Sequence, residues 1–371
     1  MEFPKLDALL KEPLYELESS VWNPMFLNVM REVTQFHYDH CAPYHRMCEQ
    51  RGFDPATFGQ VQDIPYLPTS LFKEGLFLSI PEDEVFRQIK SSATTSGVSS
   101  RVGLDKATSR RQSKCFNKVV VNRIGAQRRK FIVLDEPGTI GRSEMVSARS
   151  STIRSLLFCA SDAVACLNED AGKLSLDEAL FDEQIQAAID ANEPVMLFGF
   201  TYILYTFVVR NILAGGKRYK LPEGSRVIHI GGWKKLEAEK VTPEKLIADC
   251  CEAFGVVPAD VVDIYGFTEQ SGLIYPSCER GLRHSVVWSD VFARDPVTLE
   301  PLPFGEEGLL QFITPIQTSY PGHSVLTEDM GVVLGQDDCP CGRTGKTFKM
   351  TGRAPNAEVR GCGDIMADAF A

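Results

Sequence analysis

The stretch Asp263-Ile264-Tyr265-Gly266-Phe267-Thr268-Glu269-Gln270-Ser271-Gly272 places an aromatic ring, a hydroxyl and a carboxylate in close order. We expect these side chains to lie at the end of a strand. Tyr265 can stack on a base, Thr268 can hydrogen-bond a phosphate, and Glu269 can hold Mg²⁺. The stretch therefore predicts a nucleotide site at a strand end.

The sequence around this stretch predicts alternating strands and helices from residue 87 to about residue 335. Expected strands cover residues 130–134, 194–198 and 225–230, and expected helices cover residues 176–191 and 242–254. Thr242, Pro243 and Glu244 suit the cap and first turn of the second helix. The first ~90 residues are predicted to be mainly helical, and strands and turns are expected after Asp290. The pattern indicates an α/β fold whose sheets are covered by helices.

The composition describes an ordinary globular protein. The chain has 371 residues, of which 44% are hydrophobic and 24% charged, enough for two large subdomains. The net charge of −10 argues against a nucleic-acid partner. The apolar residues 195–209 are too few to span a membrane and are expected in the core. Eleven cysteines without a secretory signal predict reduced thiols and a cytoplasmic location.

Three further segments suit a nucleotide. Residues 91–101 form a hydroxyl-rich loop that can cradle phosphates, although such loops are often only solvated turns. Gly231 and Gly232 follow an expected strand and allow a flat ligand to approach the backbone, or form a plain β-turn. Asp329 offers a carboxylate to two vicinal ribose hydroxyls.

Near the C-terminus, Cys362 lies between Gly361 and Gly363 and close to Arg360. Little bulk surrounds its sulfur, and the arginine favours the thiolate. The flanking glycines allow the backbone to bend, so the thiol can move between a site and a partner. By itself the segment would also fit a spare cysteine in a frayed tail.

The order of these motifs resembles the adenylate-forming superfamily of acyl and aminoacyl activators. That resemblance implies ATP and Mg²⁺ as cofactors, with Glu269 holding the metal and Thr268 beside it at the reacting phosphate. The other ATP contacts that it implies are Thr94, Thr95, Ser96 and Gly97 for the phosphates, Gly231 and Gly232 for adenine, Tyr265 and Gly266 for the base and its surroundings, Asp329 for the ribose, and Arg353 at the start of the hinge.

Within that superfamily the chain is most similar to the acyl-protein synthetases of the LuxE type, through residues 63–73, 284–288, 294–299 and 360–362. The family implies an adenylate-forming α/β fold with helix-covered sheets, a small distorted β region and a truncated C-terminal domain. We expect a mainly helical segment over residues 1–90 that packs on the core. An adenylation core with ATP and acyl sites would follow over residues 91–351, and a hinge and tail with the acceptor cysteine over residues 352–371.

The activity implied by the family is ATP-dependent formation of acyl-AMP from a carboxylic acid of the long-chain fatty type, and transfer of the acyl group to Cys362. An NADPH-dependent acyl reductase would then accept the acyl group. Two alternatives remain open: an acyl-CoA ligase of the phenylacetate-CoA ligase type, and a non-catalytic acyl carrier or scaffold. The phosphate loop departs from its relatives at Ala93 and Thr94 and the hinge at Asn356, and a segment carrying a catalytic lysine is missing.

Two groups of cysteine and histidine residues are candidates for a metal site because of their spacing. Cys339 and Cys341, with Cys278 and His284, are spaced to form a Cys₃His zinc site, and the pattern leaves structural zinc and free buried thiols open. A second group, His37, Cys41, His45 and Cys48, would line one helix face, but Pro43 interrupts that helix. We therefore expect buried or capped side chains in the second group.

Overall fold

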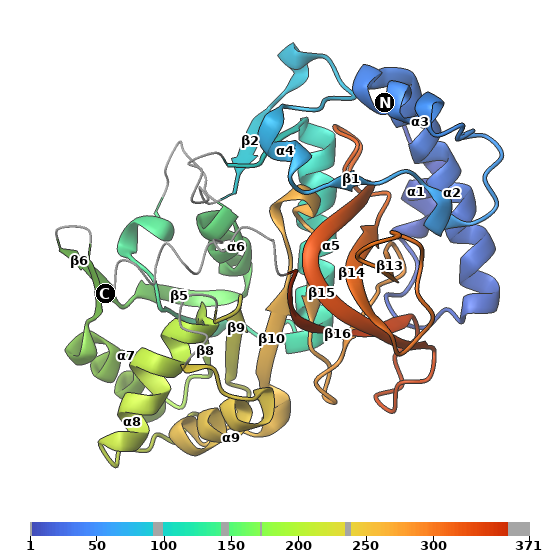
Figure 1. Ribbon diagram of the computed structural model, residues 1–371. Helices are drawn as coiled ribbons and strands as arrows, with labels where there is room; N and C mark the ends of the chain where they lie inside the picture. The colour runs from blue at the N-terminus through green and yellow to red at the C-terminus, as the bar shows by residue number, and fades with distance from the viewer. Residues whose placement is uncertain (1, 92–98, 142–147, 171–172, 234–238, 355–371) are drawn as a thin grey trace. The chain divides into compact units, whose positions relative to one another are not determined.

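The computed structural model of the chain describes residues 2–91, 99–141, 148–170, 173–233 and 239–354 (Figure 1). The chain divides into two compact units. One comprises Met1–Lys90, Val98–Val119 and Gly266–Ala357, and the other consists mainly of Val120–Tyr265. The boundaries expected from the sequence at residues 90 and 351 stay predictions.

The unit built from Val120–Tyr265 contains a parallel sheet in the order β10-β9-β8-β4-β5. Its strands are β4 (Arg129–Val133), β5 (Ala160–Ala165), β8 (Val195–Phe200), β9 (Arg226–Ile230) and β10 (Val261–Tyr265). The expected strands at residues 130–134, 194–198 and 225–230 are thereby confirmed to within a few residues. Every residue of β8 is buried, as expected for a parallel strand covered on both faces.

Helices cover this sheet, and Figure 1 shows three of them, α7, α8 and α9, alongside it. The helices of this unit are α6 (Ala148–Leu156), α7 (Glu178–Asp190), a π-helix (Ile203–Val209), α8 (Arg210–Ala214) and α9 (Pro243–Phe254). Strands β6 (Leu167–Asp170) and β7 (Lys173–Leu176) form a separate hairpin. The Thr242 hydroxyl caps α9 by accepting the Lys245 N–H at 3.2 Å. Both expected helices are confirmed. The apolar residues 195–209 form β8 and the π-helix in the buried core, also as expected.

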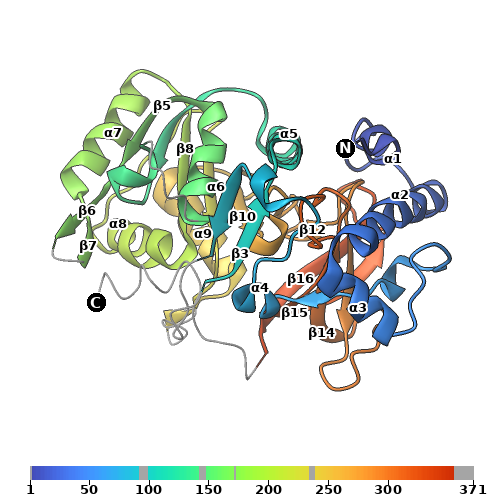
Figure 2. The ribbon, with the colours of Figure 1, turned by 90° about the horizontal axis from the view of Figure 1, so that it is seen from above.

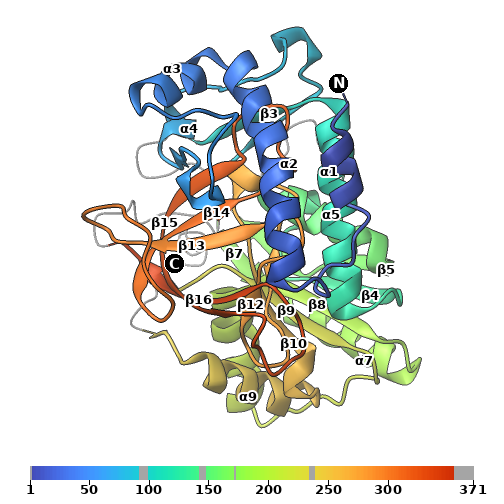
Figure 3. The same cartoon turned by 90° about the vertical axis from the view of Figure 1, so that its right-hand side faces the viewer.

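The other unit begins with helices, as predicted for the first ~90 residues: α1 (Pro4–Leu9), α2 (Ser19–His40), α3 (Ala42–Gln50) and α4 (Leu71–Glu74). Helix α5 (Lys106–Ile124) begins in this unit. One face of α2 is apolar and buried, including Trp22, Phe26 and Met30. Figure 3 shows α2 beside strands β13 (Asp290–Arg294) and β14 (Glu307–Ile313).

An antiparallel sheet in the order β12-β16-β15-β14-β13 forms the rest of this unit. Its remaining strands are β12 (Arg283–His284), β15 (Ser324–Gln336) and β16 (Lys346–Arg353), and β1 (Leu67–Pro68) pairs parallel to β15. Side chains of α3, α4 and β15 share one buried cluster, and Figure 2 shows these elements side by side. A separate hairpin joins β2 (Arg87–Lys90) to β3 (Arg101–Leu104). The strand-rich region expected after Asp290 is confirmed.

Candidate functional site

Glu269 lies in a buried turn, the 3-10 helix Thr268–Gln270. The side-chain amide of Gln270 donates through Nε2 to the backbone carbonyls of Phe312 and Gly322, each at 3.0 Å. The Tyr320 hydroxyl donates to the Glu269 carbonyl at 2.9 Å. These bonds fix the backbone of the turn to β14 and to the segment before β15, so Thr268 and Glu269 are presented from a rigid support.

The Glu269 carboxyl has an environment that suits a bound cation. Burial raises its pKa, and the negative charge of Asp329 adds to the effect, while a hydrogen bond with Ser100 and the positive charge of Lys73 oppose it. A buried carboxylate gains from a nearby positive charge because it has lost much of its hydration. Mg²⁺ binds carboxylate and phosphate oxygens, so this environment fits the predicted metal role.

Asp329 and Arg353 form a cross-strand pair on β15 and β16. The Arg353 guanidinium contacts Asp329 Oδ1 at 3.3 Å and Glu328 Oε2 at 2.8 Å. The side chains of Asp329 and Arg353 remain 25% and 30% exposed, so both can reach a ligand. The structure thus brings three of the predicted residues together within one unit: Glu269, Asp329 and Arg353.

The other unit carries the predicted adenine segment. Gly231 follows β9 with φ 84°, a left-handed backbone that favours glycine, whereas among the described residues no atom lies within 4 Å of a Cβ added at Gly232. The Thr201 hydroxyl donates to the Gly231 carbonyl at 2.6 Å and contacts His229 Nδ1 at 2.9 Å. This turn therefore has a bound carbonyl followed by a sterically open glycine. Tyr265, also predicted to bind ATP, ends β10 in the same unit.

Several predicted residues lie outside the described part of the chain: Thr94, Thr95, Ser96, Gly97 and the acceptor Cys362. The described strand ends on either side of the phosphate loop are paired, Lys90 with Arg101. Gly266 is described, and a Cβ there would lie 3.2 Å from the Leu273 carbonyl, which restricts this position to a small residue.

Two residues near Glu269 carry no role in the sequence interpretation. Lys73 lies on α4 within the segment that supports the family resemblance, and Ser100 ends the hydroxyl-rich loop. Only the tertiary structure reveals that Ser100 hydrogen-bonds with Glu269 and that the positive charge of Lys73 acts on the same carboxyl. The signal available in the sequence was the lysine inside the family-like segment 63–73.

The four zinc candidates also come together. The donor atoms of Cys278, His284, Cys339 and Cys341 all lie within 4.8 Å of one another. The second group behaves as expected for buried or capped side chains. His37 bonds to Ser79 Oγ at 2.7 Å and to the Gln317 carbonyl at 2.8 Å, and Cys41 and Cys48 are buried in the apolar cluster under α3. The expected interruption of the helix is present: α2 ends at His40, and Pro43 lies in the first turn of α3.

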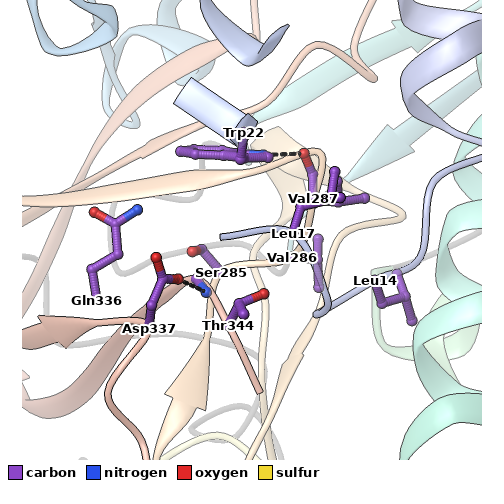
Figure 4. Close-up of a pocket in the computed structure, with 10 residues that line it drawn as sticks. Leu14, Leu17, Trp22, Ser285, Val286, Val287, Gln336, Asp337 and Thr344 are labelled. Carbon is purple, nitrogen blue, oxygen red and sulfur yellow. Dashed lines mark hydrogen bonds between the residues drawn. The ribbon is translucent and has the colours of Figure 1, made fainter. Parts of the chain in front are cut away.

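A small pocket lies in the same unit as the zinc candidates, between the start of α2 and the loops that lead into β13 and β16. Figure 4 shows Leu14, Trp22, Val287 and Thr344 around it, with the Trp22 indole donating to the Val287 carbonyl at 2.7 Å. Its free volume of about 10 Å³ admits about one water molecule, so it is far too small for an acyl chain. No helix among the described residues is long and apolar enough to cross a membrane.

Comparison with known proteins gives a consistent result. The sequence profile of the family described as acyl-protein synthetase, LuxE, matches residues 7–371. A long-chain-fatty-acid--luciferin-component ligase from Vibrio harveyi is 26% identical over 344 residues, covering 91% of this chain and 85% of that protein. A phenylacetate-coenzyme A ligase from Thermus thermophilus is 24% identical over 360 residues, covering 92% and 70% respectively.

Among solved structures, a 2-hydroxyisobutyryl-CoA ligase superposes with a TM-score of 0.70 at 15% identity, covering 92% of this chain and 72% of that one. Identity this low shows the fold alone. The likeness confirms the predicted α/β fold of adenylate-forming enzymes.

Proposed function

The chain belongs to the acyl-protein synthetase (LuxE) family, and from this we propose that it uses ATP to convert a long-chain fatty acid to acyl-AMP and then acylates its own Cys362. The observation that carries the proposal is the buried Glu269 turn with Asp329 and Arg353 in the same unit. These are the residues to which the resemblance to the superfamily assigns the metal, ribose and hinge roles, and that assignment is part of the proposal. The proposal extends to delivery of the acyl group to an NADPH-dependent acyl reductase.

Two displacements make up the proposed reaction. A carboxylate oxygen of the acid attacks the α-phosphate of ATP, the bond to the β-phosphate breaks, and pyrophosphate leaves. The Cys362 thiolate then attacks the acyl carbon of the mixed anhydride, and AMP leaves as the thioester forms. A covalent intermediate of this kind divides one difficult acylation into two easier steps.

The described residues have separate proposed roles. Thr268 hydrogen-bonds a phosphate oxygen, and the Asp329 carboxylate accepts hydrogen bonds from the ribose hydroxyls. Arg353 holds Asp329 in place through their ion pair. Glu269 is the proposed Mg²⁺ ligand, and the ion would neutralise charge on the phosphates. Lys73 contributes a positive charge that favours the ionised Glu269 carboxylate.

One alternative keeps the first step and changes the acceptor to coenzyme A, as the name of the Thermus relative suggests. The other, a carrier or scaffold without catalysis, is opposed by the Glu269 turn, because retention of a buried carboxylate is costly without a bound cation to offset it. The two displacements can be measured separately, which distinguishes all three functions.

The test uses the full chain with ATP, Mg²⁺ and a panel of fatty acids. We expect acid-dependent exchange of pyrophosphate into ATP, and an acyl mass on the protein that hydroxylamine removes. Cys362→Ser should keep the exchange and lose the acyl label. Acyl groups on added coenzyme A, or on another cysteine of the variant, would refute self-acylation, and an absence of exchange with every acid would favour the scaffold.

A further inference from the structure

We propose that Cys278, His284, Cys339 and Cys341 bind one structural Zn²⁺, and that this ion holds the β15–β16 loop against the connection between α1 and α2. This inference is independent of the proposed activity. The cluster lies in the described part of the antiparallel-sheet unit, on a turn before β12, on β12 itself and on the loop between β15 and β16.

The spacing of the donor atoms fits a tetrahedral ion. A zinc ion with Zn–S distances of about 2.3 Å and Zn–N distances of about 2.0 Å needs donors roughly 3.5 to 3.8 Å apart. Cys341 Sγ and His284 Nε2 are 3.3 Å apart, and no pair among the four exceeds 4.8 Å. Small side-chain rotations would therefore complete the geometry without moving a strand.

The turns that carry the sulfurs are held by backbone hydrogen bonds. The Arg280 N–H donates to Cys278 Sγ at 3.4 Å, and Cys341 Sγ contacts His284 Nε2. Gly342, with φ 82°, closes the Cys339 turn by donating to the Cys339 carbonyl at 3.0 Å.

The donor set selects the metal. Three sulfurs and one imidazole suit Zn²⁺ and disfavour Mg²⁺ or Ca²⁺, which bind oxygen. His284 is 2% exposed, Cys278 4% and Cys339 8%, and Cys341 is half-buried, so four protein donors can complete the coordination of a tetrahedral ion. A closed site of this kind is structural in character.

The ligands are adjacent to the contacts that hold Tyr15, in the connection between α1 and α2 (residues 10–18). Elsewhere in this connection the Lys118 ammonium donates to the Leu10 and Glu12 carbonyls, and the Val287 N–H donates to the Leu14 carbonyl. The Thr344 N–H donates to the Tyr15 carbonyl at 3.0 Å, and the Arg343 guanidinium lies 5.6 Å from the centre of the Tyr15 ring. The Tyr15 ring also meets the His284 ring edge-on at 5.9 Å. Because Arg343 and Thr344 lie two and three residues after Cys341, metal at the cluster would order the surface that contacts Tyr15.

Metal analysis of the purified full-length protein is the direct test. We expect about one zinc per chain by mass spectrometry, and Co²⁺ exchanged into the site should show the visible bands of a tetrahedral thiolate complex. Removal by a chelator should lower the melting temperature and speed amide exchange over residues 10–18 by at least about tenfold. A protein that stays metal-free after reconstitution with zinc, or that contains a disulfide within the cluster, overturns the proposal.

Variants separate metal binding from simple packing. His284→Ala should lose the zinc, whereas His284→Cys, which supplies a fourth thiolate, should retain it. Cys251→Ser, a half-buried cysteine in the other unit, serves as the matched control and should keep one zinc per chain. If His284→Ala retains full zinc, the assignment of this ligand is wrong. If either histidine variant fails to fold, the cobalt spectrum of the unaltered protein still decides the question.

Discussion

At the scale of single residues, Glu269 shows a conflict between function and stability. The unfolded carboxyl titrates near its ordinary pKa of 4.5, whereas burial raises its pKa in the folded protein. The folded state therefore binds this proton more tightly than the unfolded state does. Ionisation of Glu269 costs stability as the pH rises through this range, and the cost persists at neutral pH.

Glu269→Gln should separate the two effects. We expect pyrophosphate exchange to fall by about 100-fold or more, because a bound metal ion contributes several kcal/mol to phosphoryl chemistry. The melting temperature at pH 7.5 should stay equal or rise, since the buried charge is gone. Glu300→Gln, at an exposed position, is the control and should change neither quantity. Unaltered exchange in the Glu269 variant would remove the metal assignment.

Lys73 is a second residue whose role can be tested through pH. Its charge lowers the pKa of Glu269 against the larger effect of burial. Lys73→Met should thus reduce exchange by about tenfold and move the acid limb of the pH–rate profile to higher pH. Lys73→Arg should restore much of the rate, and Lys114→Met, on the exposed side of α5, should have no effect. A lower rate with an unshifted profile would indicate a structural role only.

At the scale of elements, the two glycines in the turn after β9 have different explanations, one in folding and the other in ligand binding. Gly231 has a left-handed backbone, and an added Cβ would also lie 3.4 Å from the Phe200 ring. Gly232 has neither constraint in the described structure. Its lack of a side chain is therefore unexplained by folding, and the approach of a flat base to the backbone would explain it.

The two alanine variants of this turn should behave differently. Gly231→Ala is expected to cost about 1–2 kcal/mol of stability, because an L-residue is strained in this conformation. Gly232→Ala should leave the melting temperature unchanged and weaken ATP binding measured by calorimetry. Equal ATP affinity in the Gly232 variant and the unaltered protein would contradict a base at this position.

At the scale of the whole molecule, a buried histidine pair links α2 to the segment before β15 in the same unit and makes stability sensitive to pH. The rings of His37 and His323 stack at 4.5 Å, and His323 Nε2 contacts the Tyr44 hydroxyl at 3.0 Å. Burial lowers the pKa of His37 from 6.5 to about 3 and the pKa of His323 well below 6.5. The folded protein therefore keeps both rings neutral while the unfolded chain takes up protons below pH 6.5.

Stability should consequently fall as the pH drops from 6.5 toward 3. Each histidine contributes a loss of about 2 kcal/mol by pH 5, because the unfolded state is then protonated and the folded state is not. His37→Gln removes one titrating group, so its stability deficit relative to the unaltered protein should shrink by this amount between pH 7 and pH 5 in urea unfolding. A deficit that is constant with pH would show that His37 is not neutral in the fold. Comparison at each pH cancels the opposing contribution of buried carboxyls.

The sequence by itself determined the elements whose signals are local. Strand and helix periodicity located β4, β8, β9, α7 and α9 because buried faces repeat along the chain, and Thr242 identified a helix start through its own cap. The order of motifs determined the family, since Tyr265, Glu269 and Asp329 occur in sequence whatever their distance in space.

The tertiary structure alone decided which residues meet. It placed Ser100 at Glu269, let the charge of Lys73 act on the same carboxyl, and paired Arg353 with Asp329. It also brought together Cys278, His284, Cys339 and Cys341, which the sequence had offered only as a possible set of ligands. These contacts join segments dozens to hundreds of residues apart, and no local pattern in a chain encodes the distance between side chains that only folding brings together.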